Sequence, residues 1–426
     1  MSGERSLAKR IAAAGGILFF FIMAFEVMIM ISPFAFFFYS VFSPIFNFLD
    51  GHAATRWTTL FFLPHMILPP TLFLKGVRVA GSVCFILGLA TFTVCALQVY
   101  LGKIFTWGIA SRGLYRSIRH PQYLALGVWG IGMAILWPRF IVLATLSLMF
   151  ILYYFLAKDE ERRMLSQYGE SYRHYLETTG MFLPRALEAP LAALGRRLFP
   201  ANAVKYAVIP VLIVALVMGS GFLLRDITLR SLPLAARANL TLVPILPEDG
   251  ALEARVLTGI LTAAAAGRVP FLQADRTYLG YLMPADYIMQ GMIADTGDRS
   301  HLFKHHHTIA LISDWVFHPF AHLRRPPAAH MAAMHGVDPK VARRHHCPVG
   351  LNQAAMDCDT CTIRRVILVE VTPAPGQAAC GEDLLAGNVT RIPVGFIDLD
   401  TQNGRIINAK SVAKSHAWND VPTPEI

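Results

Sequence analysis

Charged residues are scarce in this chain. Asp, Glu, Lys and Arg make up 15% of its 426 residues, while 54% are hydrophobic; ordinary soluble domains are about 25% charged. This composition excludes a disordered chain and argues against a wholly water-soluble one. Six cysteines over this length exclude a disulfide scaffold. A glycine loop that follows a strand and could hold a nucleotide is also missing, because Gly219 and Gly221 lie inside an apolar run.

Acidic residues are fewer than basic ones, 28 against 38, and the formal net charge is +10. A basic chain suits either nucleic acid or a membrane surface, and the 28 Phe in apolar blocks favour the membrane and no nucleic acid. The apolar excess is concentrated before Leu224, whereas the tail after Arg225 has the composition of a water-exposed domain. We therefore expect a multi-pass membrane protein with a soluble appendage.

About six segments are candidates to cross a bilayer, which requires about 20 predominantly apolar residues in a helix. The expected spans are Ile17–Phe38, Thr58–Leu74, Val79–Leu101, Tyr123–Leu136, Phe140–Leu156 and Val204–Leu224. The fourth and fifth are separated only by Trp137-Pro138-Arg139, which predicts a tight helical hairpin. The N-terminus has the charge order of a signal peptide but no small-residue cleavage site, so we expect a retained span.

The Lys and Arg of the short loops predict the orientation. The loops after the third and fifth spans carry most of these residues and should be cytoplasmic. If all six segments cross, Arg5, Lys9 and Arg10 lie on the opposite side. One early segment that does not cross would resolve this conflict. The last span then places the C-terminal domain outside the cytoplasm of what we expect to be a bacterial cytoplasmic membrane.

The helical hairpin predicts a cluster of polar side chains where its two ends meet at one membrane face. It places Arg119, His120 and Tyr123 beside Glu160 and Glu161. Charged groups at the end of apolar helices are costly unless they are paired, and such clusters are often functional. From composition alone, an interfacial collar of Arg and Tyr anchors is an equally good interpretation.

The order of the motifs changes this balance. They are Gly113-x-Tyr-Arg-x-x-Arg-His-Pro-x-Tyr123, the hairpin, Glu160-Glu161, Tyr168-Gly-x-x-Tyr172-x-x-Tyr175 and Pro184. From about Gly113 to Pro184 the chain resembles the isoprenylcysteine carboxyl methyltransferase and phospholipid methyltransferase superfamily of integral membrane enzymes. The resemblance implies S-adenosylmethionine binding at the cytoplasmic face. The positions carried over as cofactor-binding are His120, Pro121, Tyr123, Glu160 and Glu161, with Arg119 and Tyr172 in supporting roles. The chain departs from many members in having its Gly at position 127 rather than nearer Tyr123.

These residue types suit the cofactor. A carboxylate such as Glu161 accepts hydrogen bonds from ribose hydroxyls or an ammonium group, and His120 or Arg119 can hold a carboxylate. The motifs identify no catalytic residue. A carboxylate acceptor needs no general base, whereas an amine must arrive neutral, with His120 or Glu160 available to take a proton.

Two hypotheses for function follow. The first is methyl transfer from S-adenosylmethionine to a lipid-like or prenylated membrane substrate, with the bilayer as its surroundings. The second is a non-catalytic structural or assembly subunit of a larger membrane complex, in which the C-terminal domain docks on a protein partner. On either hypothesis, the expected domains are residues 1–200 (membrane methyltransferase-like), 201–226 (an additional transmembrane helix) and 227–426 (soluble).

The tail is rich in His and Cys. Cys358 and Cys361 have the spacing of metal ligands, and Cys347, His345 and His346 could supply more, yet an exterior location favours disulfides or inert thiols. We therefore predict no metal site, with these five residues as weak candidates. Thr362 follows the Cys pair where covalent haem attachment would require His.

An α+β fold is expected for the tail. Apolar residues at helical spacing predict a helix over Asp249–Ala265. Strands are predicted at Arg364–Thr372 and Val394–Leu399, followed by a hairpin turn at Asn403-Gly404. Asp398, Asp400 and Asn403 could ligate calcium, but the loop lacks the full calcium spacing, and an Asn-Gly turn is the simpler explanation.

Overall fold

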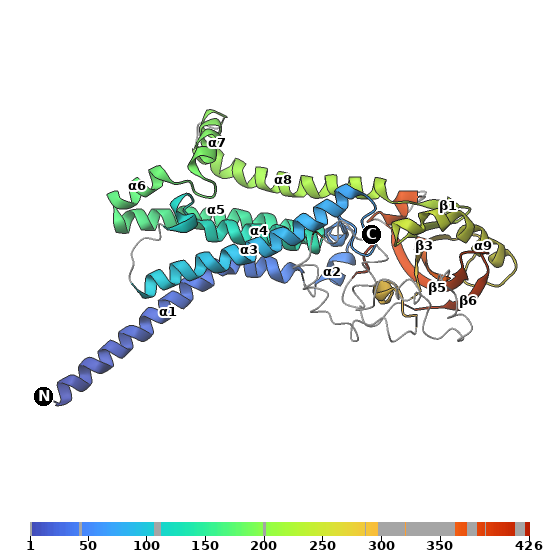
Figure 1. Ribbon diagram of the computed structural model, residues 1–426, viewed down its shortest axis with the longest axis horizontal. Helices are drawn as coiled ribbons and strands as arrows, with labels where there is room; N and C mark the ends of the chain where they lie inside the picture. The colour runs from blue at the N-terminus through green and yellow to red at the C-terminus, as the bar shows by residue number, and fades with distance from the viewer. Residues whose placement is uncertain are drawn as a thin grey trace. The chain divides into compact units, whose positions relative to one another are not determined.

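The computed structural model describes residues 2–41, 45–105, 112–198, 202–285, 287–296, 320, 363–372, 381–387, 389–413 and 422–426. These fall into two compact units (Figure 1). The first unit comprises Met1–Phe42, Leu87–Ile131 and Ala144–Val217. The second unit comprises Ser43–Ile86, Gly132–Leu143 and Met218–Ile426. Long helices contribute to both units, so neither corresponds to a single stretch of chain.

Apolar helices dominate the chain up to residue 231. They are α1 (Ser2–Val41), α3 (Leu72–Ile104), α4 (Pro121–Leu136), α5 (Phe140–Tyr168) and α8 (Asn202–Ser231). Smaller helices are α2 (Phe46–Asp50), α6 (Glu170–Thr178) and α7 (Arg185–Leu198). Four stretches within the described residues are long and apolar enough to cross a membrane: Met23–Val41, Leu72–Ile104, Phe140–Tyr168 and Ala207–Ser231. Pro121–Leu136 is a shorter apolar helix. Helices therefore occupy five of the six expected spans.

The remaining expected span, Thr58–Leu74, is not a helix, and this prediction is wrong. Only a single 3-10 turn, Arg56–Thr59, precedes an irregular stretch, and α3 begins at Leu72. Pro64, Pro69 and Pro70 remove backbone donors and block a helix in this stretch. Its apolar side chains instead pack inside the second unit, where Met66 and Ile67 are fully buried. The high hydropathy of this stretch reflects side chains that are buried within the protein.

Glycines allow the backbones of α3 and α4 to pack closely. In the first unit, a Cβ on Gly88 would lie 2.3 Å from the backbone nitrogen of Trp129. In the second unit, a Cβ on Gly132 would lie 2.4 Å from the backbone nitrogen of Phe85. Close contact through small residues is a common mode of helix packing in membranes. It holds α4 against α3 and so helps to position the polar N-terminal end of α4.

The second unit contains a six-stranded sheet in the order β1-β2-β3-β4-β5-β6. Its strands are Ala235–Arg237, Leu240–Pro244, Thr277–Pro284, Ile363–Thr372, Thr390–Asp400 and Ile406–Ser411. Neighbouring strands are antiparallel except β2 and β3, which are parallel and joined through α9 (Glu253–Ala265). The sheet and helix predicted for the tail are present, although Pro247–Leu252 is a 3-10 turn before α9.

Each face of the sheet carries its own core. Residues of α9, such as Val256 and Ile260, pack against Leu242, Val366 and Ile397. The other face is covered partly by the stretch that was expected to span the membrane. The amide of His65 donates to the carbonyl of Ile426 at 2.9 Å, and that of Leu68 donates to Ile245 at 2.9 Å. The second unit therefore includes a stretch of chain that precedes α3.

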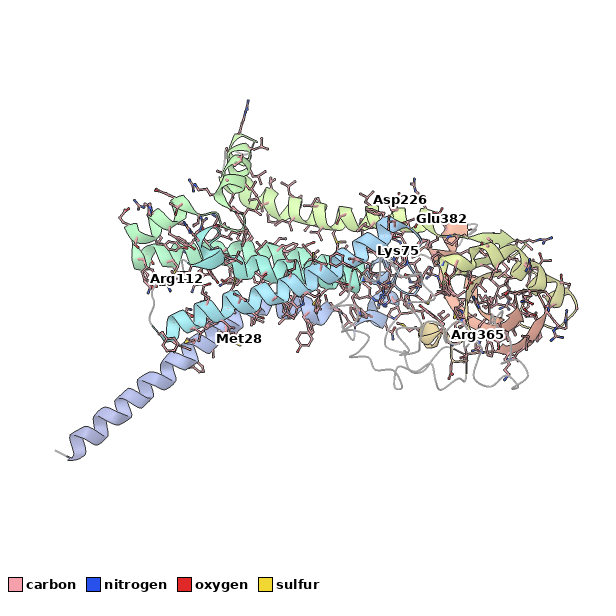
Figure 2. The ribbon with its side chains drawn as sticks, viewed as in Figure 1. Met28, Lys75, Arg112, Asp226, Arg365 and Glu382 are labelled. Carbon is pink, nitrogen blue, oxygen red and sulfur yellow. The ribbon has the colours of Figure 1, made fainter. Side chains whose placement is uncertain are left out.

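A buried ion pair links two central strands. Arg365, labelled in Figure 2, donates from Nε to Oδ1 of Asp398 at 2.7 Å and from Nη2 to Oδ2 at 3.0 Å. Asp398, which the sequence offered as a calcium ligand, is thus engaged by a guanidinium. The predicted turn is present, since Asn403 Nδ2 donates to Asp400 and Gly404 has φ +71°. The left-handed conformation explains why Gly stands at this position.

Candidate functional site

The polar cluster lies where the start of α4 approaches the C-terminal half of α5, within the first unit. His120 immediately precedes α4 and Pro121 is the first residue of that helix, a position where its missing N–H costs nothing. Glu160 and Glu161 lie on α5. Nε of Arg119 contacts Oε1 of Glu161 at 2.7 Å, and the hydroxyl of Tyr123 donates to Glu160 at 3.2 Å. The structure therefore brings together the residues that the hairpin argument placed side by side.

A short loop after α6 supports this cluster from behind. The amides of Arg119 and His120 donate to the carbonyls of Gly180 and Met181 at 2.8 and 3.1 Å. Nη1 of Arg119 also donates to the carbonyl of Thr179. Gly180 is required here, because a Cβ would lie 1.9 Å from the carbonyl oxygen of Leu183. The loop of residues 179–183, which we call the backing loop, thus fixes the backbone of the site.

Aromatic rings fix the side chains. The His120 ring stacks on Tyr123 with centroids 5.4 Å apart and an interplanar angle of 9°, and Tyr123 stacks on Tyr153 at 4.8 Å. Tyr172, expected in a supporting role, is buried on α6, and its ring lies 5.8 Å from that of Tyr175. Burial, and then the charges of Glu161 and Glu160, raise the pKa of Tyr172. Tyr172 therefore stays a neutral wall of the cluster.

His120 has a polar atom to spare. Its side chain is buried, Nδ1 lies 3.5 Å from Glu160, and Nε2 has no hydrogen-bond partner in the described residues. The nearest carboxylate oxygen to Nε2, on Glu161, is 3.7 Å away. Burial lowers the pKa of His120, but the neighbouring carboxylates of Glu160 and Glu161 outweigh it and the net shift is upward. An unsatisfied buried donor costs about 1–3 kcal/mol, so a polar partner at Nε2 would be favourable.

Five residues next to this cluster were not among the predicted site residues. Four of them contact one another: Tyr100 and Gln122 each place a donor 3.8 Å from the sulfur of Met30, and Tyr115 donates to Gln122. The fifth, Glu26 of α1, forms an ion pair with Lys103 of α3. Glu26 lies inside a candidate span, and an ionisable residue there was a signal that could have been used. Met30 carried no such signal, because a thioether in an apolar helix reads as core.

The donor set suits an S-adenosylmethionine-like ligand. The unpaired Nε2 of His120 can donate to a carboxylate, and Glu160, whose side chain is 37% exposed, can accept from an ammonium group. Glu161 is more enclosed and already pairs with Arg119. Arg119 is therefore a positioning residue in this arrangement.

The metal candidates of the tail are not part of this cluster. Cys347, Cys358, Cys361, His345 and His346 lie outside the described residues, as does Cys380. Within the described ranges no group of three or more His, Cys, Asp or Glu could hold a metal ion.

Residues 77–171 match the family model described as phospholipid methyltransferase. The match confirms the resemblance inferred from the motifs and extends it back into α3. No curated protein and no solved structure matches the chain. Together with the long apolar helices, the match supports an integral membrane methyltransferase that acts on a membrane substrate. Nothing supports the alternative of a non-catalytic structural subunit.

Proposed function

We propose that this methyltransferase transfers the methyl group of S-adenosylmethionine to a lipid-like or prenylated membrane substrate, with a carboxylate or an amine as acceptor. One observation carries the proposal. Within the family-matched segment, a buried histidine lies between two glutamates at the end of two apolar helices, and one of its ring nitrogens has no hydrogen-bond partner among the described residues. A collar of lipid anchors would face its polar atoms to solvent or headgroups and would leave none buried without a partner.

The residues divide the work of binding. His120 Nε2 would donate to the carboxylate of the cofactor, and Glu160 would accept from its ammonium group or ribose. Glu161 forms an ion pair with Arg119, and Pro121 begins α4. The Tyr123 ring stacks on one face of His120. Bound S-adenosylmethionine supplies a methyl group on a positively charged sulfur.

Methyl transfer would depend on the orientation of the acceptor and on exclusion of water. In-line attack needs the acceptor atom about 3–3.5 Å from the methyl carbon. A carboxylate acceptor loses its charge as it attacks a sulfonium, so a dry site accelerates the step. An amine acceptor has to be neutral when it attacks, and Glu160 would take the proton that the methylated amine releases.

The helices and the basic loops support one orientation of the chain. Because the stretch before Leu72 is not a helix, we infer five crossings: α1, α3, α4, α5 and α8. Arg5, Lys9 and Arg10 then share the cytoplasmic side with the basic loops around the site, which removes the conflict in the charge distribution. The sheet lies on the opposite side of the membrane.

An impermeant thiol reagent tests this orientation in intact cells. A cysteine introduced at Asn403 should be labelled and one at Gly169 should not. Labelling of both positions, or of Gly169 alone, would overturn it.

The test of activity uses the purified full chain in lipid nanodiscs with methyl-labelled S-adenosylmethionine. Membrane lipid extracts and prenylated peptides are supplied as acceptors, and the label is expected in one organic-phase product. Glu160→Gln should reduce the transfer strongly, whereas Asp159→Asn, a neighbouring exposed position on α5, should not. Failure of the wild-type chain to bind S-adenosylmethionine would contradict the proposal.

A further inference from the structure

Helix α7 presents an apolar face that nothing in the described residues covers. Leu187, Leu191 and Leu194 recur at the spacing of one helix face and are 59%, 59% and 53% exposed. Arg185 and Ala192 lie on the opposite side of the helix. A row of exposed leucines on a soluble surface is unfavourable, so this face requires a covering partner.

The direction of α7 indicates that partner. Figure 1 shows α7 running across the direction of α5 and of the start of α8, both of which are apolar helices of spanning length. A helix perpendicular to spanning helices lies along the membrane surface. Helix α8 begins at Asn202, shortly after α7 ends at Leu198, and Arg185 and Arg197 supply positive charge. Amphipathic helices of this kind bury their apolar face at the boundary of headgroups and acyl chains.

The other side of α7 is tied to the site. Oε2 of Glu188 accepts the backbone N–H groups of Met181 at 2.6 Å, Phe182 at 3.2 Å and Leu183 at 3.4 Å. Nη1 of Arg185 donates to the carbonyl of Leu176 at 3.2 Å. Met181 in turn accepts the amide of His120. One carboxylate on α7 therefore gathers the backing loop on which His120 is held.

We propose that α7 is an interfacial helix whose leucine face lies in the lipid bilayer, and that Glu188 transmits this placement through the backing loop to His120. The first part rests on the helix alone. The second part rests on the proposed function, since it predicts that cofactor affinity depends on how α7 sits on the lipid. Glu188 is a positioning residue: it touches the backing loop and not the ligand.

The placement of α7 is tested on the full chain in vesicles of phosphatidylcholine and phosphatidylglycerol in equal amounts. An environment-sensitive fluorophore is attached at Leu191→Cys or, as the matched control, at Ala192→Cys, and the unsubstituted chain reports labelling of native cysteines. The Leu191 probe should shift to the blue and be quenched by lipids brominated in their acyl chains, and the Ala192 probe should do neither. A water-exposed Leu191 probe would overturn the inference.

The link to the site is tested by titrating S-adenosylmethionine into the same vesicles. Leu191→Asp should weaken binding roughly fivefold or more, the lower end of typical coupling between sites, and Ala192→Asp should not. Glu188→Ala should weaken binding roughly tenfold, with partial rescue in Glu188→Gln, whose amide oxygen still accepts. Unchanged affinity in Leu191→Asp and Glu188→Ala would refute the link. If the wild-type chain binds no S-adenosylmethionine, the proposed function fails, while the fluorescence result still decides where α7 lies.

Discussion

Among the described residues, Arg365–Asp398 in the second unit and Arg119–Glu161 in the first are both buried arginine–carboxylate pairs, and the two differ in how completely they are satisfied. In the second unit, Arg365 makes two bonds to Asp398, a third to Gln290 at 2.9 Å, and covers the Phe396 ring at 4.2 Å. In the first unit, Arg119 makes a single hydrogen bond to Glu161. It also donates to the backbone carbonyls of Leu176 and Thr179.

The neighbours of the two pairs differ in the same sense. Asn408 adds a further donor to Asp398 at 3.3 Å. Beside Glu161, by contrast, His120 keeps an unpaired nitrogen and Glu160 is partly exposed. Burial of charge is therefore not by itself a sign of function. A saturated network stabilises the fold, and an incomplete one with access to its surroundings suits a ligand.

The largest expected effect is on the saturated pair. Arg365→Ala leaves Asp398 buried without its partner, which should cost about 3–5 kcal/mol in the free energy of unfolding of the second unit. Near-UV circular dichroism during denaturation in detergent measures this loss. Arg276→Ala, which breaks the exposed pair of Arg276 with Glu370, is the control and should cost far less. Equal losses in the two variants would contradict the comparison.

The incomplete cluster should respond in affinity more than in stability. His120→Ala removes a charge-assisted hydrogen bond to the cofactor, and Glu161→Ala removes the one that positions Arg119. Such a bond is worth about 1.5–3 kcal/mol, so in each variant S-adenosylmethionine should bind roughly ten- to a hundredfold more weakly. Isothermal titration calorimetry measures the change, with Asp159→Ala as an exposed control on the same helix. Wild-type-like titration curves for both variants would remove these residues from the site.

A third buried carboxyl sharpens the comparison because one of its oxygens, Oε1 of Glu253, has no hydrogen-bond partner among the described residues. Burial raises its pKa to about 7. From pH 4.5 to 7 the unfolded chain loses this proton while the folded chain keeps it, so stability falls as the pH rises. Glu253→Gln should remove that loss. After a discount for solvent screening we expect a gain of roughly 1–2 kcal/mol at pH 8.

Chemical unfolding of the second unit at pH 4 and at pH 8 checks the prediction. No gain is expected at pH 4, where the carboxyl is protonated in both states. A gain of the same size at pH 4 and pH 8 would show that ionisation is not its cause.

The smallest effect is expected at Tyr123. Tyr123→Phe keeps the ring stacked between His120 and Tyr153 and removes only the hydroxyl that donates to Glu160. A neutral donor contributes about 0.5–1.5 kcal/mol, so S-adenosylmethionine affinity should fall only a few-fold. Tyr123→Ala, which also removes the stacked ring, should bind more weakly than Tyr123→Phe. The reverse order would assign the hydroxyl the larger role.

Local patterns predicted much of this protein. Long apolar runs marked α1, α3, α4, α5 and α8 because a helix is the only way for one segment to satisfy its own backbone in lipid. The short break at Pro138 predicted the hairpin, and the hairpin alone brought His120 to Glu160 and Glu161. Helical spacing and the Asn403-Gly404 turn likewise located α9 and the hairpin of β5 and β6.

Contacts between distant residues were not predictable in this way. Hydropathy predicts a span at Thr58–Leu74 because it measures how apolar a segment is and not where the segment is buried. The sheet provides the core in which Met66 and Ile67 are buried. The sequence suggested Asp398 as a calcium ligand because its actual partner, Arg365, lies 33 positions away in the sequence.

The sequence by itself determined the membrane character, the helical hairpin and the residue types of the site, because each depends on periodicity or spacing along the chain. The tertiary structure decided which polar groups are saturated and which are left over. It paired Arg365 with Asp398, left Nε2 of His120 unpaired, and placed Glu188 on the backing loop. The physical reason is that hydrogen-bond satisfaction depends on every group within about 3 Å, and the fold alone determines which groups those are.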